Sequence, residues 1–160
     1  MANLSTDPIA KLMQEHDEAL LQLKHLNNAI TSIGEEGYSA LAFRQVSTAL
    51  RFIAEEVNVH NRREEQALFP VLERRVDGPT KVLRSDHVRL RRGFVRLNAA
   101  VARVKKDREN RSSLRRLTGI GKDVVQLFVN HIHKENHILF PLVRQLLTKD
   151  ELREIAKKLV

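Results

Sequence analysis

The chain has 160 residues, of which 42% are hydrophobic and 30% are charged, with a formal net charge of +8 and no cysteine. These values indicate one soluble globular domain, and they exclude a disulfide framework, a thiolate metal site and a cysteine nucleophile. No apolar run approaches the roughly 20 residues that span a bilayer, and residues 1–11 lack the pattern of a signal peptide. We therefore expect a cytoplasmic protein without a membrane segment.

Glycine and proline are scarce, and apolar residues recur every three or four positions in four segments, which predicts helices rather than strands. The segments span about 9–30, 50–71, 83–104 and 120–146. The sequence Ser-Thr-Asp-Pro at 5–8 predicts the first helix start, and Thr148-Lys149-Asp150-Glu151 predicts a capping box and a short last helix. Short connections between four amphipathic helices predict an all-α fold: an antiparallel up-down four-helix bundle with a short C-terminal helix.

Two stretches of the sequence are near-copies of each other. "HNRREEQALFP" occupies residues 60–70 and "HIHKENHILFP" occupies residues 131–141, so that a shift of 71 positions aligns them and also places His16 on His87. We interpret residues 1–160 as a single domain built from two helical hairpin repeats, at about 8–77 and 79–147.

Each of the four apolar stripes contains one histidine, and two of them also contain a glutamate. These residues are His16, His60, His87, His131, Glu64 and Glu135. A lone buried histidine is usually a satisfied core residue, but a buried glutamate needs a positive partner, and the stripes offer no lysine or arginine. Helix geometry places the four histidines at one level of the bundle, so the six side chains converge and a metal can supply the missing positive charge.

The number and type of these ligands narrow the choice of metal. Six ligands are too many for one zinc ion, while magnesium and calcium prefer oxygen to imidazole. Mixed nitrogen and oxygen ligands in a four-helix bundle suit a pair of iron or manganese ions bridged by the glutamates.

The four stretches "QEHDEAL", "HNRREEQALFP", "SDHVRL" and "HIHKENHILFP" resemble the motifs of hemerythrin-like (HHE cation-binding) domains over essentially the whole chain. The resemblance implies two iron ions with an oxo or hydroxo bridge, held by the six residues named above, and it does not exclude manganese. Oxygen-carrying members of that family use a fifth histidine one turn after the ligand of the third helix, where this chain has Arg91. We therefore expect a more open centre, suited to redox chemistry on peroxide or nitric oxide rather than to reversible oxygen carriage.

Several nearby residues have two readings each. Glu56 is either an acid that relays protons beside the ligands or an exposed surface glutamate, and Glu15 and Asp86 either orient ligand imidazoles or are solvated. Pro70 and Pro141 fall inside predicted helices, where each either introduces a kink around the metals or ends the straight segment.

We expect a non-haem di-iron protein that binds and redox-processes a small oxidant, namely oxygen, peroxide or nitric oxide, with an electron donor and an oligomeric state that the sequence leaves open. The alternative is a non-catalytic protein for oxygen or iron binding, storage or sensing, so enzymatic activity stays undecided. Family relatives that repair iron–sulfur clusters carry an additional cysteine-containing domain, and the absence of cysteine here disfavours that role. Arginines crowd residues 84–116, but no aromatic residues interleave with them, so a solvated helix face is favoured over nucleic-acid binding.

Overall fold

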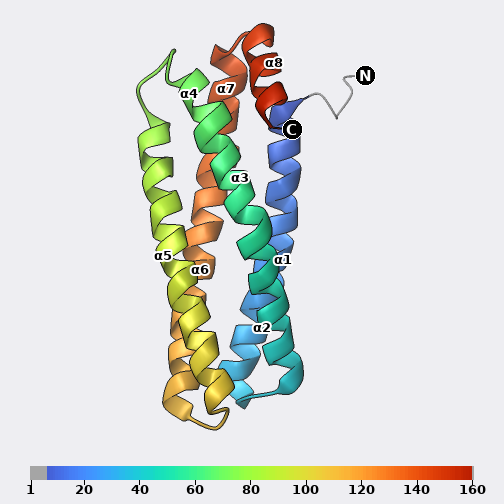
Figure 1. The fold of residues 1–160 in the computed structure, drawn as a ribbon, viewed down its shortest axis with the longest axis vertical. Helices are drawn as coiled ribbons and strands as arrows, with labels where there is room; N and C mark the ends of the chain where they lie inside the picture. Colours follow the sequence, from blue (N-terminus) through green and yellow to red (C-terminus); the bar gives the residue numbers. More distant parts are fainter. Residues whose placement is uncertain (1–6, 160) are drawn as a thin grey trace.

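The computed structural model describes residues 7–159 and shows an all-α protein, with no strand among those residues. Four long rods run antiparallel, and a short helix follows the fourth (Figure 1). The elements are α1 (Pro8–Glu36), α2 (Ala40–Phe52), η1 (Ile53–Val57), α3 (Asn58–Arg63), η2 (Glu64–Leu68), α4 (Phe69–Leu72), α5 (Pro79–Lys106), α6 (Arg111–Lys134), η3 (Glu135–Leu139), α7 (Phe140–Leu146) and α8 (Lys149–Lys158). The predicted antiparallel up-down four-helix bundle with a short C-terminal helix is confirmed.

The second and fourth rods are each continuous, although several elements make them up. The second rod runs from α2 to α4 and the fourth from α6 to α7, and the elements η1, η2 and η3 within them are single π-helical turns. No helix among the described residues is both long enough and apolar enough to cross a membrane.

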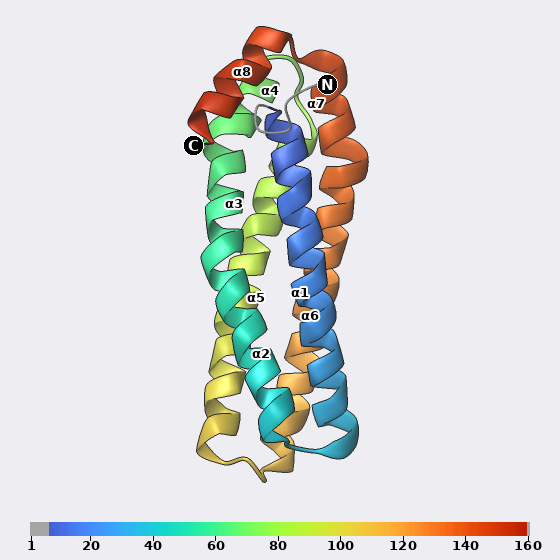
Figure 2. The same ribbon diagram turned by 90° about the vertical axis from the view of Figure 1, so that its right-hand side faces the viewer.

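The ends of the bundle follow the capping signals of the sequence. Asp7 caps α1 by accepting hydrogen bonds from the backbone N–H groups of Ile9 and Ala10, whereas Ser5 and Thr6 lie outside the described residues. Gly37, with φ of 86°, ends α1, a conformation that glycine adopts without strain. The predicted capping box of α8 is present at Thr148 and Glu151, and α8 crosses one end of the bundle beside the start of α1 (Figure 2).

The two prolines inside the rods neither break nor end them. Each rod continues past its proline, from Pro70 to Leu72 and from Pro141 to Leu146. A π-helical turn precedes each proline: the N–H of Phe69 bonds the carbonyl of Glu64, and the N–H of Phe140 bonds that of Glu135. A wider turn accommodates a residue that cannot donate to the helix ladder.

The buried interior is divided by a polar layer. One apolar cluster fills most of the bundle, and a second, smaller one lies at the end closed by α8. On α1 the smaller cluster stops at Leu12 and the larger begins at Ala19, and His16 lies between them. The same interruption occurs at the matching level of the other three rods, which places the polar residues of all four stripes in one layer.

Candidate metal centre

The six residues singled out in the sequence meet in this polar layer. His16 comes from α1, His60 from α3 and Glu64 from η2, while His87 comes from α5, His131 from α6 and Glu135 from η3. All six are buried, with exposed fractions between 0% and 6%. Helical spacing of four residues places His60 and Glu64, and likewise His131 and Glu135, on one face of their rods.

The first half of the layer is built around His16 and His60. Their Nε2 atoms lie 3.1 Å apart, and the Nε2 of His60 lies 2.8 Å from Oε1 of Glu64. The Nε2 of His16 lies 3.4 Å from Oε1 of Glu135. The Nε2 atoms of His16 and His60 therefore face a common point, together with the carboxylates of Glu64 and Glu135.

The second half repeats this arrangement around His87 and His131. Their Nε2 atoms lie 3.2 Å apart, and the Nε2 of His131 lies 2.8 Å from Oε1 of Glu135. The Nε2 of His87 lies 3.3 Å from Oε2 of Glu64. Glu64 thus presents one oxygen to each half, and both glutamates belong to both groups that could hold a cation: His16, His60, Glu64 and Glu135, and Glu64, His87, His131 and Glu135.

The unpaired oxygens of the two glutamates fit a pair of metal ions. Oε2 of Glu64 and both carboxylate oxygens of Glu135 are buried and form no hydrogen bond of good geometry among the described residues, although imidazole Nε2 atoms lie 3.3 Å from Oε2 of Glu64 and 2.8 Å from Oε1 of Glu135. Leaving a buried charged group unpaired is strongly unfavourable, whereas a cation satisfies it. The donor set of four imidazoles and two shared carboxylates suits divalent first-row metals with nitrogen and oxygen ligands.

The outer nitrogen, Nδ1, of each of the four histidines in the layer lies within hydrogen-bonding distance of a side-chain oxygen atom. Nδ1 of His60 lies 2.9 Å from Glu15, and Nδ1 of His131 lies 3.2 Å from Asp86. Since a carboxylate only accepts, Nδ1–H donates, and each imidazole keeps the lone pair of Nε2 for the interior. The structure thus places Glu15 and Asp86 in contact with the histidines that the orienting role requires.

Two further partners were missed by the sequence analysis. Nδ1 of His87 lies 2.8 Å from Oε1 of Glu65, and Nδ1 of His16 lies 2.7 Å from Oδ1 of Asn136. Glu65 and Asn136 directly follow the two buried glutamates and are themselves 71 residues apart. The repeat was the signal that could have identified them.

Cations outside the layer neutralise these outer acids. Arg63 lies 3.3 Å from Glu15, and Lys134, which occupies the matching repeat position, lies 2.8 Å from Asp86. Arg91, the residue at the position of the family's fifth histidine, points to Oε1 of Glu65 at 3.8 Å and its side chain is half-exposed. Arg91 therefore acts on the surroundings of His87 and contributes no ligand atom to the interior.

The phenylalanine of each Leu-Phe-Pro sequence packs on a histidine of the layer. Phe140 stacks on His16 and Phe69 on His87, with ring centroids 5.3 and 5.8 Å apart. Each ring fixes the imidazole plane from the side of the smaller apolar cluster.

Charge in the metal-free layer is balanced by protons. Burial by itself would lower the pKa of His60, but the carboxylates of Glu64 and Glu15 outweigh it and raise the pKa to about 10. The pKa of His131 is raised for the same reason, chiefly by Glu135 against the effect of burial. Burial would raise the pKa of Glu135, but the positive charge of the neighbouring His131 holds it well below its usual value of 4.5. Protonated imidazoles thus supply the positive charge that a metal would replace.

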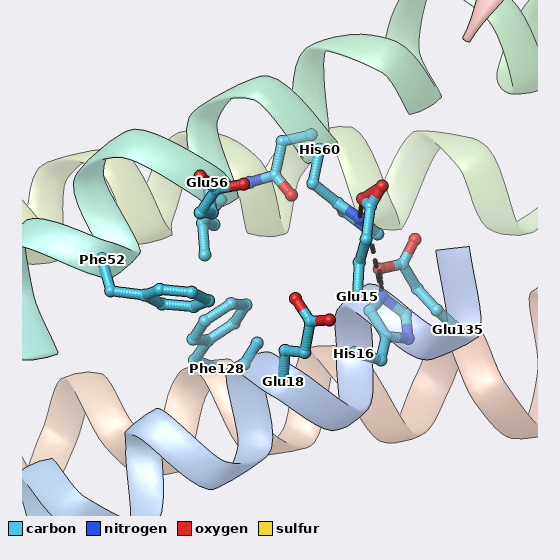
Figure 3. A pocket seen from close by; sticks show the side chains of 11 residues that line it. Glu15, His16, Glu18, Phe52, Glu56, His60, Phe128 and Glu135 are labelled. Atoms are coloured by element: carbon cyan, nitrogen blue, oxygen red, sulfur yellow. Dashed lines mark hydrogen bonds and ion pairs between the residues drawn. The ribbon is translucent and has the colours of Figure 1, made fainter. Parts of the chain in front are cut away.

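A small cavity reaches the first half of the layer from the surface between α1 and the second rod. Its volume is about 20 Å³, close to the room that a water molecule needs, and His16, His60 and Glu135 form its inner end. Figure 3 shows Phe52 and Phe128 at the end away from the histidines. Its remaining lining residues are Glu15, Glu18, Ala19, Glu56, Val57 and Asn61.

Glu56 lies in the lining of this cavity on the second rod, opposite Glu18 of α1 (Figure 3). Its side chain is exposed, and no hydrogen bond joins it to a ligand residue within the described part of the chain. A part in relaying protons from solvent to the layer stays a prediction for this residue.

Comparison with known proteins decides the family. Residues 7–143 match the family model described as hemerythrin HHE cation binding domain. The chain belongs to the hemerythrin HHE cation-binding family. Among curated proteins it is similar to the iron–sulfur cluster repair proteins YtfE of Yersinia pseudotuberculosis serotype IB (strain PB1/+) and of Yersinia pestis (strain Pestoides F), with 27% identity over 146 residues in both cases. Those alignments cover 88% of this chain but only 65% of the length of either relative.

Proposed function

We propose that this hemerythrin-family protein holds two iron ions in its polar layer and uses them to bind and redox-process a small oxidant. His16 and His60 would hold one ion, His87 and His131 the other, and Glu64 and Glu135 would be shared between them. The observation that carries the proposal is the convergence of four buried imidazoles on two buried carboxylates, each of which belongs to both ligand groups. When bound, such a pair supplies two-electron redox chemistry, with an oxo or hydroxo bridge between the ions.

The residues of the chain prepare this chemistry in three ways. Glu15, Asp86, Glu65 and Asn136 fix the imidazole rings so that Nε2 faces the interior. The two apolar clusters exclude bulk water from both ends of the layer. The narrow cavity beside His16 and His60 limits access to molecules about the size of water, which favours peroxide, oxygen or nitric oxide over organic substrates.

A second candidate function is non-catalytic oxygen or iron binding, storage or sensing, because the same layer serves a protein that only binds. The relatives named above bear the name of iron–sulfur cluster repair proteins, and this chain covers 65% of their length and has no cysteine of its own. We propose a cytoplasmic location, in keeping with the absence of cysteine.

Metal analysis combined with Mössbauer spectroscopy of protein produced in iron-replete cells tests the proposal. We expect two iron ions per chain and the antiferromagnetic coupling of a bridged ferric pair, and the metal analysis also distinguishes iron from manganese. Rapid consumption of peroxide or nitric oxide favours the redox function, while a stable and reversible oxygen adduct favours a carrier. A folded protein that binds no transition metal would refute both.

A further inference from the structure

The cavity beside His16 and His60 carries a hydrogen-bonding group that the metal centre does not use. Asn61 lines this cavity and is only 4% exposed, and its Oδ1 atom is buried with no hydrogen-bond partner among residues 7–159. Asn61 also borders a surface groove between α3 and α5.

An unpaired buried amide oxygen is unfavourable by itself. Folding removes the water that would bond it in the unfolded chain, and nothing in the described protein replaces that water. A water molecule or a ligand in the cavity can complete the hydrogen bonding of such a group.

The two hairpins differ beside their histidines: the groove at the matching positions Arg89, Asp123 and Leu127 is not lined by His87 or His131. At the positions 71 residues further along, Leu90 takes the place of Ala19, Leu127 that of Glu56 and Ile132 that of Asn61. Leu90 and Ile132 are fully buried, and Leu127 packs against the larger apolar cluster. Beside His87 and His131, larger apolar side chains therefore occupy the positions that Ala19, Glu56 and Asn61 occupy beside His16 and His60.

Apart from the two histidines and the NH2 group of Asn61, the polar part of the lining consists of hydrogen-bond acceptors. Besides Oδ1 of Asn61 it contains the carboxylates of Glu15, Glu18 and Glu56, and Glu135 lies at the inner end. Hydrogen bonding to a ligand therefore requires donors on the ligand, which dioxygen and nitric oxide lack. Anions such as nitrite or azide are repelled by the carboxylates.

We propose that this cavity binds hydrogen peroxide as a neutral molecule beside His16 and His60, with Asn61 Oδ1 accepting a hydrogen bond from one of its O–H groups. The inference rests on the proposed di-iron function and deepens it, since it selects peroxide among the three small oxidants. Asn61 is in this reading a positioning residue that sets ligand preference.

The test uses the variant Asn61→Leu, which keeps the approximate shape of the side chain and removes the acceptor. The matched control is Asn58→Leu on the same helix, because Asn58 is exposed and lies outside the lining of this cavity. Iron content is measured first in the parent and in both variants. Unfolding of the metal-free proteins by urea shows whether Asn61 supports the fold, and we expect Asn61→Leu to unfold at the same or a higher urea concentration than the parent.

Ligand preference is then measured on anaerobically reduced, iron-loaded protein. Stopped-flow absorption gives the rate constant for oxidation by hydrogen peroxide, in which two electrons from the ferrous pair and two protons convert one peroxide molecule into two water molecules. Titration with nitric oxide gives a binding affinity that involves no turnover. We expect Asn61→Leu to lower the peroxide rate constant about tenfold, the effect of one lost hydrogen bond, and to change the nitric oxide affinity less than twofold.

Four other outcomes overturn the inference. Equal losses for peroxide and nitric oxide would show that Asn61 only shapes the cavity, and unchanged values with normal iron content would show that it does not contact the ligand. A loss of the same size in Asn58→Leu would show that the effect is not specific to the cavity. If the parent itself binds no iron, the proposed function fails and this inference fails with it.

Discussion

The phenyl ring of Phe140 stacks on the imidazole ring of His16, with centroids 5.3 Å apart and planes inclined by 26°. The two residues come from opposite hairpins, and Phe69 and His87 form the equivalent pair with an inclination of 18°. The Leu-Phe-Pro sequence that ends each near-copy therefore supports a histidine of the other half.

Replacing Phe140 by leucine should weaken both the fold and the metal site. We expect the free energy of unfolding of the metal-free protein to fall by about 1 kcal/mol, the size of an aromatic pair, in urea denaturation. Metal affinity should fall as well, because His16 loses the ring that holds its plane. The control is Phe43→Leu, which removes a buried aromatic partner of Tyr38 far from the layer and should lower stability alone. Equal metal affinities in Phe140→Leu and the parent would contradict this role.

The variant Asp86→Asn tests the partners of the outer imidazole nitrogens. Asp86 accepts a hydrogen bond from His131 and forms an ion pair with Lys134 at 2.8 Å. The neutral amide of the variant makes a weaker hydrogen bond to the imidazole and cannot form the ion pair. We expect metal affinity to fall by roughly ten- to a hundredfold in competition with a chelator. The control is Asp123→Asn, an exposed substitution on α6, which should leave the metal affinity unaltered.

Metal stoichiometry distinguishes shared from unshared ligands. His16 belongs to one of the two ligand groups, whereas Glu135 belongs to both. We therefore expect His16→Ala to retain about one metal ion per chain and Glu135→Ala to retain none, as counted by elemental analysis. His133→Ala, an exposed substitution two residues from His131, should retain both ions. Two ions in the glutamate variant would exclude a bridging role.

Metal uptake should release protons and strengthen as the pH rises. The folded metal-free protein holds a proton on His60 up to a pKa of about 10, and metal binding must displace it. Calorimetry in buffers of different ionisation enthalpy should therefore show proton release at pH 7. Uptake without proton release would contradict this charge balance.

The stability of the metal-free protein should pass through a maximum as the pH rises. Because the pKa of His60 is raised on folding, its contribution is complete below pH 6.5 and is lost as the pH rises through about 10. The pKa of Glu135 is lowered, so its contribution is present above pH 4.5 and is lost in acid. We expect thermal unfolding of the metal-free protein to show a maximum of stability between these limits and a decline toward pH 10.

Removing negative charge from the cavity mouth should admit anions. Glu18 and Glu56 face each other across it and are both exposed, so glutamine at both positions keeps the size of the side chains and removes their charge. We expect azide to bind the ferric protein several-fold more tightly in the double variant, with the difference shrinking at high salt as the charges are screened. A salt-independent gain would indicate a change of shape instead.

The sequence alone was sufficient for the number and order of the long helices and for the six residues of the layer, although the second and fourth rods begin at Ala40 and Arg111, about ten residues before the predicted segments. Spacings of three and four residues show which side of each helix is buried, and the shift of 71 aligns His16 with His87 and Glu64 with Glu135. A buried carboxylate without a cation is unfavourable enough that its position in an apolar stripe already indicates a ligand. These conclusions depend on periodicity and on the cost of burying charge, which are both local to each helix.

The tertiary structure was needed wherever two rods meet. Whether Glu65 reaches His87, or Asn136 reaches His16, depends on how the rods are rotated about their axes, and residues at the edge of a stripe have no periodic signal of their own. The cavity beside Asn61 depends on the volumes of side chains from three rods packed together, so only their arrangement shows that this cavity reaches His16 and His60 while Leu90 and Ile132 are buried beside the other two histidines.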